Sequence, residues 1–165
     1  MRLTKQWFTG VLLLLGLMVT VHAEVPDLGL RDFDGKPVSL DRYVGNGKWT
    51  LVMFWGLNCP ICERNKPEIV SFYNRHKGKD AQVVGVAING MENREAIKAL
   101  LKKSPTGFPN YIAELGLMAI NYQIASEESF RGTPTYWLFS PKGELLAVNP
   151  GPVRAEALES YIASH

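Results

Sequence analysis

The sequence predicts an α/β domain in which helices flank a mixed central sheet. Residues 49–55 and 82–88 are continuous apolar runs, a pattern typical of central strands that are buried on both faces. Each run is followed by a helical pattern, and strand–helix–strand units pair their strands in parallel. Residues 135–139 and 145–149 predict two late strands joined by a Pro-Lys-Gly-Glu turn, so a hairpin adds an antiparallel edge to the sheet.

The other elements follow from short-range signals. The turn at Asp34-Gly35 predicts an N-terminal hairpin over residues 25–40. Pro67 lies inside a predicted helix, where it should produce a kink and free a backbone carbonyl. The predicted helices cover residues 60–76, 93–103, 115–124 and 154–163.

The first 23 residues predict an export signal. A short basic region precedes an apolar stretch over residues 7–21, and Val21 and Ala23 are small residues where a signal peptidase recognises its site. A membrane span needs about 20 residues, and the apolar stretch is shorter than that, so the sequence favours cleavage of the signal. A retained membrane anchor is the alternative. We therefore expect residues 24–165 to form one domain outside the cytoplasm, either free in the periplasm or tethered through residues 7–21.

The charge of the chain argues against some classes of partner. The sequence has 18 Lys and Arg against 16 Asp and Glu, a formal net charge of +2. Arg2 and Lys5 lie in the predicted export signal, so the remaining domain has balanced charge. A balanced charge disfavours nucleic acid or an anionic membrane surface as the main partner.

Two cysteines, Cys59 and Cys62, are the most informative residues of the chain. Outside the cytoplasm such a pair is expected to form a disulfide. A bridge that closes so short a loop stabilises a fold very little, so the pair predicts redox chemistry rather than a structural staple. The pair lies between a strand and a helix that starts at Pro60, and the positive end of a helix favours a thiolate.

These motifs resemble the thioredoxin fold, and within it the exported TlpA, ResA and DsbE-like thiol-disulfide oxidoreductases. The likeness rests on Trp55, the Cys-Pro-Ile-Cys turn, Pro67 after the second cysteine, and the Thr133-Pro134 pair before a late strand. The Asp-Phe-Asp-Gly-Lys-Pro-Val-Ser-Leu opening and the Pro-Lys-Gly-Glu turn support it. The resemblance covers residues 25–164 and implies a thioredoxin-like three-layer sandwich with an N-terminal β-hairpin extension.

The resemblance also implies catalytic roles. Cys59 is expected to be the nucleophile and Cys62 the thiol that resolves a mixed disulfide. An acidic residue at the position of Glu92 helps to move a proton to or from the buried thiol in ResA-like proteins, although a solvated loop carboxylate is the plain alternative.

A substrate-binding edge is implied beside the cysteines. Pro134 is expected to be a cis-proline that aims the Thr133 backbone at a bound chain, against an ordinary trans proline at the start of a strand. Trp55 is expected to cover the disulfide. The alternative is that it only packs in the core, and a tryptophan in either role would look the same in the sequence. Pro60 completes the predicted substrate-binding set, and Asn58 departs from the aromatic residue that many relatives carry before the first cysteine.

As a function, the resemblance implies a periplasmic reductant of disulfides in envelope proteins such as apocytochrome c. A membrane electron donor of the DsbD or CcdA type would recharge it, and no cofactor or metal is expected. A dithiol oxidant remains open, because the motif alone does not fix the reduction potential. Residues 115–132 form a long link that is either a substrate-selecting loop or an idle insertion.

A Sco-like copper-binding metallochaperone is the alternative from another class. Those proteins use a Cys-x-x-x-Cys pair and a distant histidine, and this sequence has two residues between its cysteines and no histidine in the late loop. Two thiolates can still bind Cu(I), so the alternative stays open. A peroxidatic role is disfavoured because the Thr-x-x-Cys turn is absent.

Overall fold

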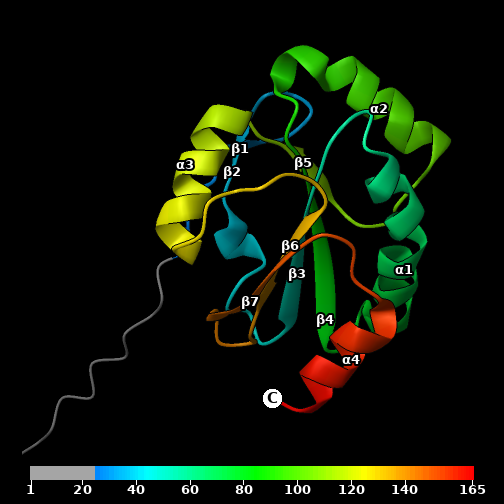
Figure 1. Cartoon of the computed structure of the whole chain (residues 1–165), viewed down its shortest axis with the longest axis vertical. Helices are drawn as coiled ribbons and strands as arrows, with labels where there is room; N and C mark the ends of the chain where they lie inside the picture. The colour runs from blue at the N-terminus through cyan, green and yellow to red at the C-terminus, as the bar shows by residue number, and fades with distance from the viewer. Residues whose placement is uncertain (1–24) are drawn as a thin grey trace, which may run out of the picture.

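A seven-stranded mixed sheet is the centre of the computed structural model, which describes residues 25–165 (Figure 1). The strand order is β2-β1-β5-β4-β3-β6-β7. The strands are β1 (Leu30–Arg31), β2 (Pro37–Val38), β3 (Trp49–Trp55), β4 (Ala81–Ala87), β5 (Asn110–Ile112), β6 (Thr135–Phe139) and β7 (Leu145–Pro150). The predicted export signal, residues 1–23 with the possible tether at 7–21, lies outside the described residues.

Helices cover both faces of this sheet (Figure 1). Helices α1, α2 and α4 pack on one face, and α3 packs on the other. The helices are α1 (Pro60–His76), α2 (Arg94–Lys103), α3 (Leu115–Ser126) and α4 (Ala155–Ala163), with short 3-10 turns η1 (Leu40–Arg42) and η2 (Met91–Asn93). The predicted three-layer arrangement is therefore confirmed. Between residues 25 and 165, no helix has both the length and the apolar character needed to cross a membrane.

The strand pairing follows the prediction from chain order. β3 pairs in parallel with β4, and β4 with β5. β6 pairs antiparallel with β3 and with β7, which gives the predicted hairpin edge. The N-terminal hairpin is also present, because β1 and β2 pair antiparallel, although each strand has only two residues.

Strand β5 was not predicted. It has three residues and follows a segment rich in turn formers that includes Pro105, Gly107 and Pro109. So short a run shows no usable period. The strand completes the sheet by pairing with both β4 and β1, and thereby joins the N-terminal hairpin to the rest of the sheet.

Helix α3 accounts for most of the long link over residues 115–132. Met118 and Tyr122 are fully buried in the core on its face of the sheet, where Tyr122 stacks on Trp137 of β6. The helical part of the link is therefore a structural layer rather than an idle insertion. Whether residues 127–132 select substrates stays a prediction.

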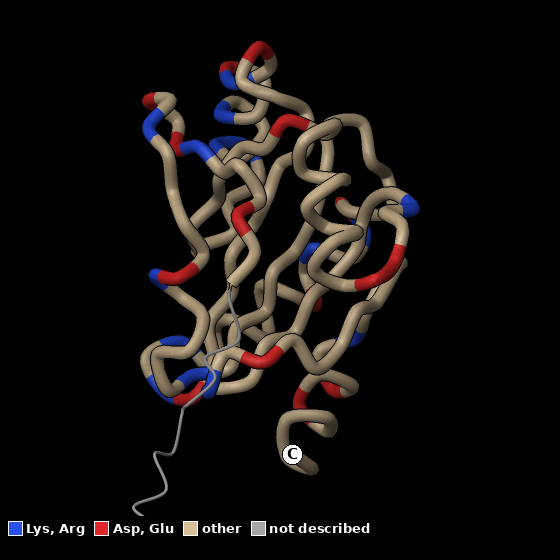
Figure 2. Tube along the Cα trace, turned by 90° about the vertical axis from the view of Figure 1, so that its left-hand side faces the viewer, with Lys and Arg blue, Asp and Glu red and all other residues tan. Residues whose placement is uncertain are grey.

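Acidic and basic residues are interspersed along the trace, mostly in loops and at helix ends (Figure 2). The distribution agrees with the balanced charge of the sequence. The parallel strands β3 and β4 end at the same edge of the sheet. The two cysteines follow β3 at this edge.

Candidate active site

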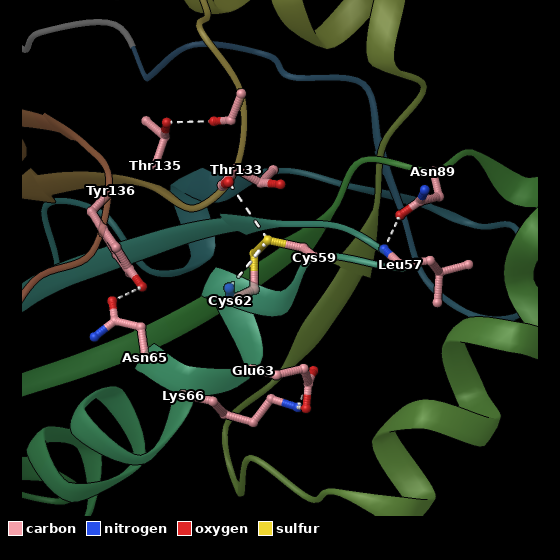
Figure 3. The surroundings of a disulfide bond; sticks show 11 residues. Leu57, Cys59, Cys62, Glu63, Asn65, Lys66, Asn89, Thr133, Thr135 and Tyr136 are labelled. Atoms are coloured by element: carbon pink, nitrogen blue, oxygen red, sulfur yellow. Dashed lines mark hydrogen bonds and ion pairs between the residues drawn. A yellow bond between two sulfur atoms is a disulfide. The ribbon is translucent and has the colours of Figure 1, made fainter.

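Cys59 and Cys62 form a disulfide at the N-terminal end of α1 (Figure 3). Cys59 is the N-cap residue, and its Sγ accepts a hydrogen bond from the backbone N–H of Cys62 at 3.1 Å. Pro60 occupies the first helical position, where a missing N–H costs nothing. The Cys59 sulfur therefore faces the N–H groups of the first helical turn, an environment that stabilises a thiolate.

The two sulfurs differ in access. Cys59 is half-buried, whereas Cys62 is only 1% exposed and belongs to the core beneath α1. A target disulfide can therefore approach Cys59 and not Cys62. This asymmetry is what an attacking and a resolving cysteine require.

The turn before Cys59 is fixed by a side chain from the neighbouring strand end. The Asn89 Oδ1 accepts a hydrogen bond from the Leu57 backbone N–H at 2.7 Å (Figure 3). Asn58 follows with a φ of 55°, in the left-handed region that asparagine tolerates better than aromatic residues do. The backbone conformation at this position therefore suits asparagine.

The Thr133–Pro134 peptide bond is cis, as predicted. Pro134 is buried, and its carbonyl accepts a hydrogen bond from the Gly151 N–H at 2.9 Å. The Thr133 carbonyl oxygen lies 3.5 Å from the Cys59 Sγ, close enough to accept a hydrogen bond from the reduced thiol (Figure 3). The structure thus brings Thr133, Pro134 and Cys59 together.

Trp55 lies behind the disulfide rather than at the surface. Its side chain is in the same core cluster as Cys62, and the residue is 4% exposed. The indole N–H donates to the Asn110 Oδ1 at 3.0 Å. A Cβ on Gly85 would lie 2.0 Å from that oxygen, so only glycine leaves room for this contact.

Glu92 lies at the same edge of the sheet, in η2, but it is exposed. Its carboxylate accepts a hydrogen bond from the Asn93 side chain and, with Glu114, lies over the Gly90 turn. Within residues 25–165 no hydrogen bond joins it to either sulfur. The role of Glu92 in proton transfer stays a prediction.

Two buried polar residues of α1 were missed from the sequence. The Asn65 Oδ1 accepts hydrogen bonds from the Tyr136 hydroxyl at 2.8 Å and from the Val153 N–H at 2.9 Å, and burial raises the pKa of Tyr136. Lys66 is also buried and pairs with Glu63. Both positions share the helix face of Cys62, which is the signal that could have revealed their burial.

A groove of about 310 Å³ opens beside Cys59. Its walls come from the turn after β3, the first turns of α1, and α2. The lining residues are Leu57, Asn58, Cys59, Pro60, Glu63 and Leu100. Among the residues that the structure describes, no group of three His, Cys, Asp or Glu side chains is placed to hold a metal ion.

A Cys-x-x-Cys disulfide at the strand-to-helix turn of a three-layer domain, beside a cis-proline, defines the thioredoxin-fold thiol-disulfide oxidoreductases as a class. A family model described as AhpC/TSA family matches residues 21–148 of this sequence. The chain belongs to the AhpC/TSA family.

Named relatives agree with this class. The chain is 28% identical over 170 residues to sporulation thiol-disulfide oxidoreductase A of Bacillus subtilis, covering 96% of this chain and 98% of the relative. It is 27% identical over 142 residues to thiol-disulfide oxidoreductase ResA of Bacillus thuringiensis, covering 86% and 76%. The crystal structure of StoA from Bacillus subtilis superposes with a TM-score of 0.61 at 26% identity, covering 80% of this chain and 92% of StoA.

Proposed function

We propose that this protein is an exported reductant of protein disulfides in which Cys59 attacks the target. The observation that carries the proposal is the asymmetry of the disulfide. The half-buried Cys59 sulfur faces the helix N–H groups, while Cys62 is buried beneath it. The names of the relatives, thiol-disulfide oxidoreductases, support the same chemistry.

The reaction begins with both cysteines reduced. The Cys59 thiolate attacks one sulfur of the target disulfide, a new S–S bond forms, and the other target sulfur leaves as a thiolate. Cys62 then loses its proton and attacks the Cys59 sulfur. The mixed disulfide breaks, the target leaves with both sulfurs reduced, and Cys59 and Cys62 share the new disulfide. Two electrons have moved from this protein to the target.

Substrate docking is proposed at the edge formed by Thr133 and Pro134. The Thr133 backbone lies next to the Cys59 sulfur, at the point where β6 begins, and an extended target segment can add there by backbone hydrogen bonds. Pro60 lines the groove beside Cys59. Trp55 contributes from the core, where it belongs to the same cluster of buried residues as Cys62.

Export and recharging complete the proposal. The N-terminal sequence pattern supports a position outside the cytoplasm, where the disulfide is the resting state and a reductant needs a supply of electrons. A membrane donor of the DsbD or CcdA type is the proposed source. Apocytochrome c, with its Cys-x-x-Cys-His haem attachment motif, is the proposed target among envelope proteins.

The equilibrium reduction potential tests the direction of electron flow. The purified protein is equilibrated with dithiothreitol or glutathione buffers, and the reduced fraction is measured by thiol labelling. We expect a value near that of thioredoxin, about −270 mV. A value near that of DsbA, about −120 mV, would overturn the reductant proposal in favour of an oxidant.

An oxidised peptide with a Cys-x-x-Cys-His motif tests the target. The reduced protein is expected to reduce this peptide several-fold faster than a peptide of the same composition in which one cysteine precedes the histidine and the other lies at the far end. Equal rates would remove apocytochrome c as a preferred target while leaving the disulfide chemistry intact.

A further inference from the structure

A buried lysine lies one helical turn below the active-site cysteines. Lys66 is only 7% exposed. Its Nζ lies 2.8 and 2.9 Å from the two carboxylate oxygens of Glu63 (Figure 3). It also lies 3.1 Å from the Ser104 Oγ. An ammonium group is kept buried only where it has such partners, and the disulfide chemistry described above makes no use of it.

The partner carboxylate lies in the groove beside the nucleophile. Glu63 follows Cys59 by one turn of α1, and its backbone N–H donates to the Cys59 carbonyl at 3.1 Å. Side chains four residues apart on a helix are neighbours. The Glu63 side chain is 42% exposed, and it is the charged residue among those that line the groove.

The ion pair is therefore oriented. Its negative end faces the groove with Cys59, and its positive end points into the protein towards Ser104 at the end of α2. A negative charge in the groove that Cys59 lines opposes the thiolate that the helix N–H groups favour, and the buried ammonium cancels part of this opposition.

We propose that Glu63 and Lys66 are positioning residues for the disulfide exchange, which together set how readily Cys59 forms its thiolate. The inference rests on the proposed function, because it assigns Cys59 as the nucleophile. The negative charge of Glu63 disfavours the Cys59 thiolate. Lys66 both holds the Glu63 side chain in place and offsets part of its negative charge. The pair thereby adjusts the reducing strength of the dithiol without touching the reacting sulfurs.

The test uses the fully reduced full chain and measures the rate of Cys59 alkylation by iodoacetamide across a pH series. Buried Cys62 reacts slowly, so the profile reports on Cys59. Glu63→Gln is expected to move the midpoint of the profile to lower pH by about 0.5–1 unit. Lys66→Met, which replaces the stem by an apolar chain of similar size, is expected to move it to higher pH by a similar amount. The double variant is expected to return close to the original midpoint.

The equilibrium with glutathione gives a second readout. A more stable thiolate stabilises the reduced protein, so Glu63→Gln should raise the equilibrium constant for reduction of the disulfide by about 3–10-fold, and Lys66→Met should lower it by a similar factor. Glu159→Gln is the matched control, because it also removes a carboxylate paired with a cation of α1, at the far end of the helix. It is expected to leave both readouts unchanged.

Unchanged midpoints in folded Glu63→Gln and Lys66→Met proteins would overturn the proposal and leave the pair with a structural role. Shifts of both single variants in the same direction would also overturn it, since a loosened helix and not an electric field would explain them. Alkylation needs no protein substrate, so this proposal can fail while the reductase function stands.

Discussion

The two ends of helix α1 carry the same kind of interaction in different surroundings. At the N-terminal end, buried Lys66 pairs with Glu63 next to a reactive sulfur and a groove. At the C-terminal end, Arg75 pairs with Glu159 of α4 at 2.6 Å, where both side chains are substantially exposed. Exposed ion pairs add little stability, whereas a buried charge is costly to leave unpaired.

The C-terminal cluster also includes a histidine. The ring of His76 lies 2.9 Å from the Asp80 carboxylate and 3.2 Å from that of Glu159, and it stacks on Phe72. These contacts join α1 to α4 and to the loop before β4, far along the helix from the disulfide. The two ends therefore differ in burial and neighbours rather than in the kind of ion pair, and the proposed effect on the chemistry depends on that difference.

The largest expected effect lies in the buried polar contacts near the N-terminal end. Asn65→Ala should lower the free energy of unfolding by about 2–3 kcal/mol, because the Tyr136 hydroxyl and the Val153 backbone N–H lose their buried partner. Asn74→Ala, the same change on an exposed face of α1, is the control and should change it by less than about 0.5 kcal/mol. Urea unfolding compares the two. Equal losses of unfolding free energy in the two variants would show that the buried contacts of Asn65 add no more stability than an exposed asparagine does.

The next largest effect is expected at Asn89, which follows β4 and supports the cysteine turn. Asn89→Ala removes the acceptor of the Leu57 N–H and should cost about 1–2 kcal/mol of unfolding free energy. It should also slow disulfide exchange several-fold, since the turn before Cys59 is no longer fixed. Asn46→Ala, in an exposed loop away from the disulfide, serves as the control in unfolding and rate assays. An exchange rate that stays native in Asn89→Ala would remove this residue from the site.

Glu92→Gln tests the second carboxylate near this edge of the sheet. We expect the exchange rate at neutral pH to change by less than about threefold, since the Glu92 carboxylate contacts Asn93 and the Gly90 turn. Glu114→Gln is the matched control, because that carboxylate shares the same position over Gly90. A tenfold loss confined to Glu92→Gln, in the step that resolves the mixed disulfide, would instead establish the proton-transfer role that the sequence predicts.

The smallest effect is expected at the exposed end of α1. Arg75 beside Glu159 holds the pKa of that carboxyl below its usual value. The ion pair therefore stabilises the folded state above the pKa that Glu159 has in the unfolded chain, about 4.3. This stabilisation is lost as the pH falls through the lower pKa of Glu159 in the folded protein. Glu159→Gln should cost only about 0.5 kcal/mol near neutral pH, and the difference should shrink as the pH falls through the lowered pKa of Glu159. Urea unfolding at several pH values checks this, and a loss that grows on acidification would contradict the sign.

The sequence predicted the parts of this molecule that depend on continuous local signals. Helix α1 and strands β3 and β6 have the predicted bounds. The cysteine turn and the cis bond at Pro134 followed from motifs. Strand β5 did not, because three residues among turn formers carry no period.

The supporting polar residues depend on contacts that are distant in sequence. The Asn89 side chain can accept its hydrogen bond from Leu57 only once the strands have assembled. The same holds for the hydrogen bonds that Asn65 accepts from Tyr136 and Val153. Single polar residues give no local signal for such partners. Glu92 lies in η2 after the central strand β4, and its role in proton transfer stays a prediction.

Trapping of the mixed disulfide tests the central claim, that Cys59 attacks and Cys62 resolves. Reduced Cys62→Ser and Cys59→Ser proteins are each incubated with an oxidised peptide, and the adducts are measured by mass spectrometry. The account predicts that the Cys62→Ser protein accumulates a peptide disulfide on Cys59, whereas the Cys59→Ser protein, with its remaining cysteine 1% exposed in the structure, forms almost none. Equal adduct formation on Cys62, or native-rate reduction by the Cys59→Ser protein, would contradict it.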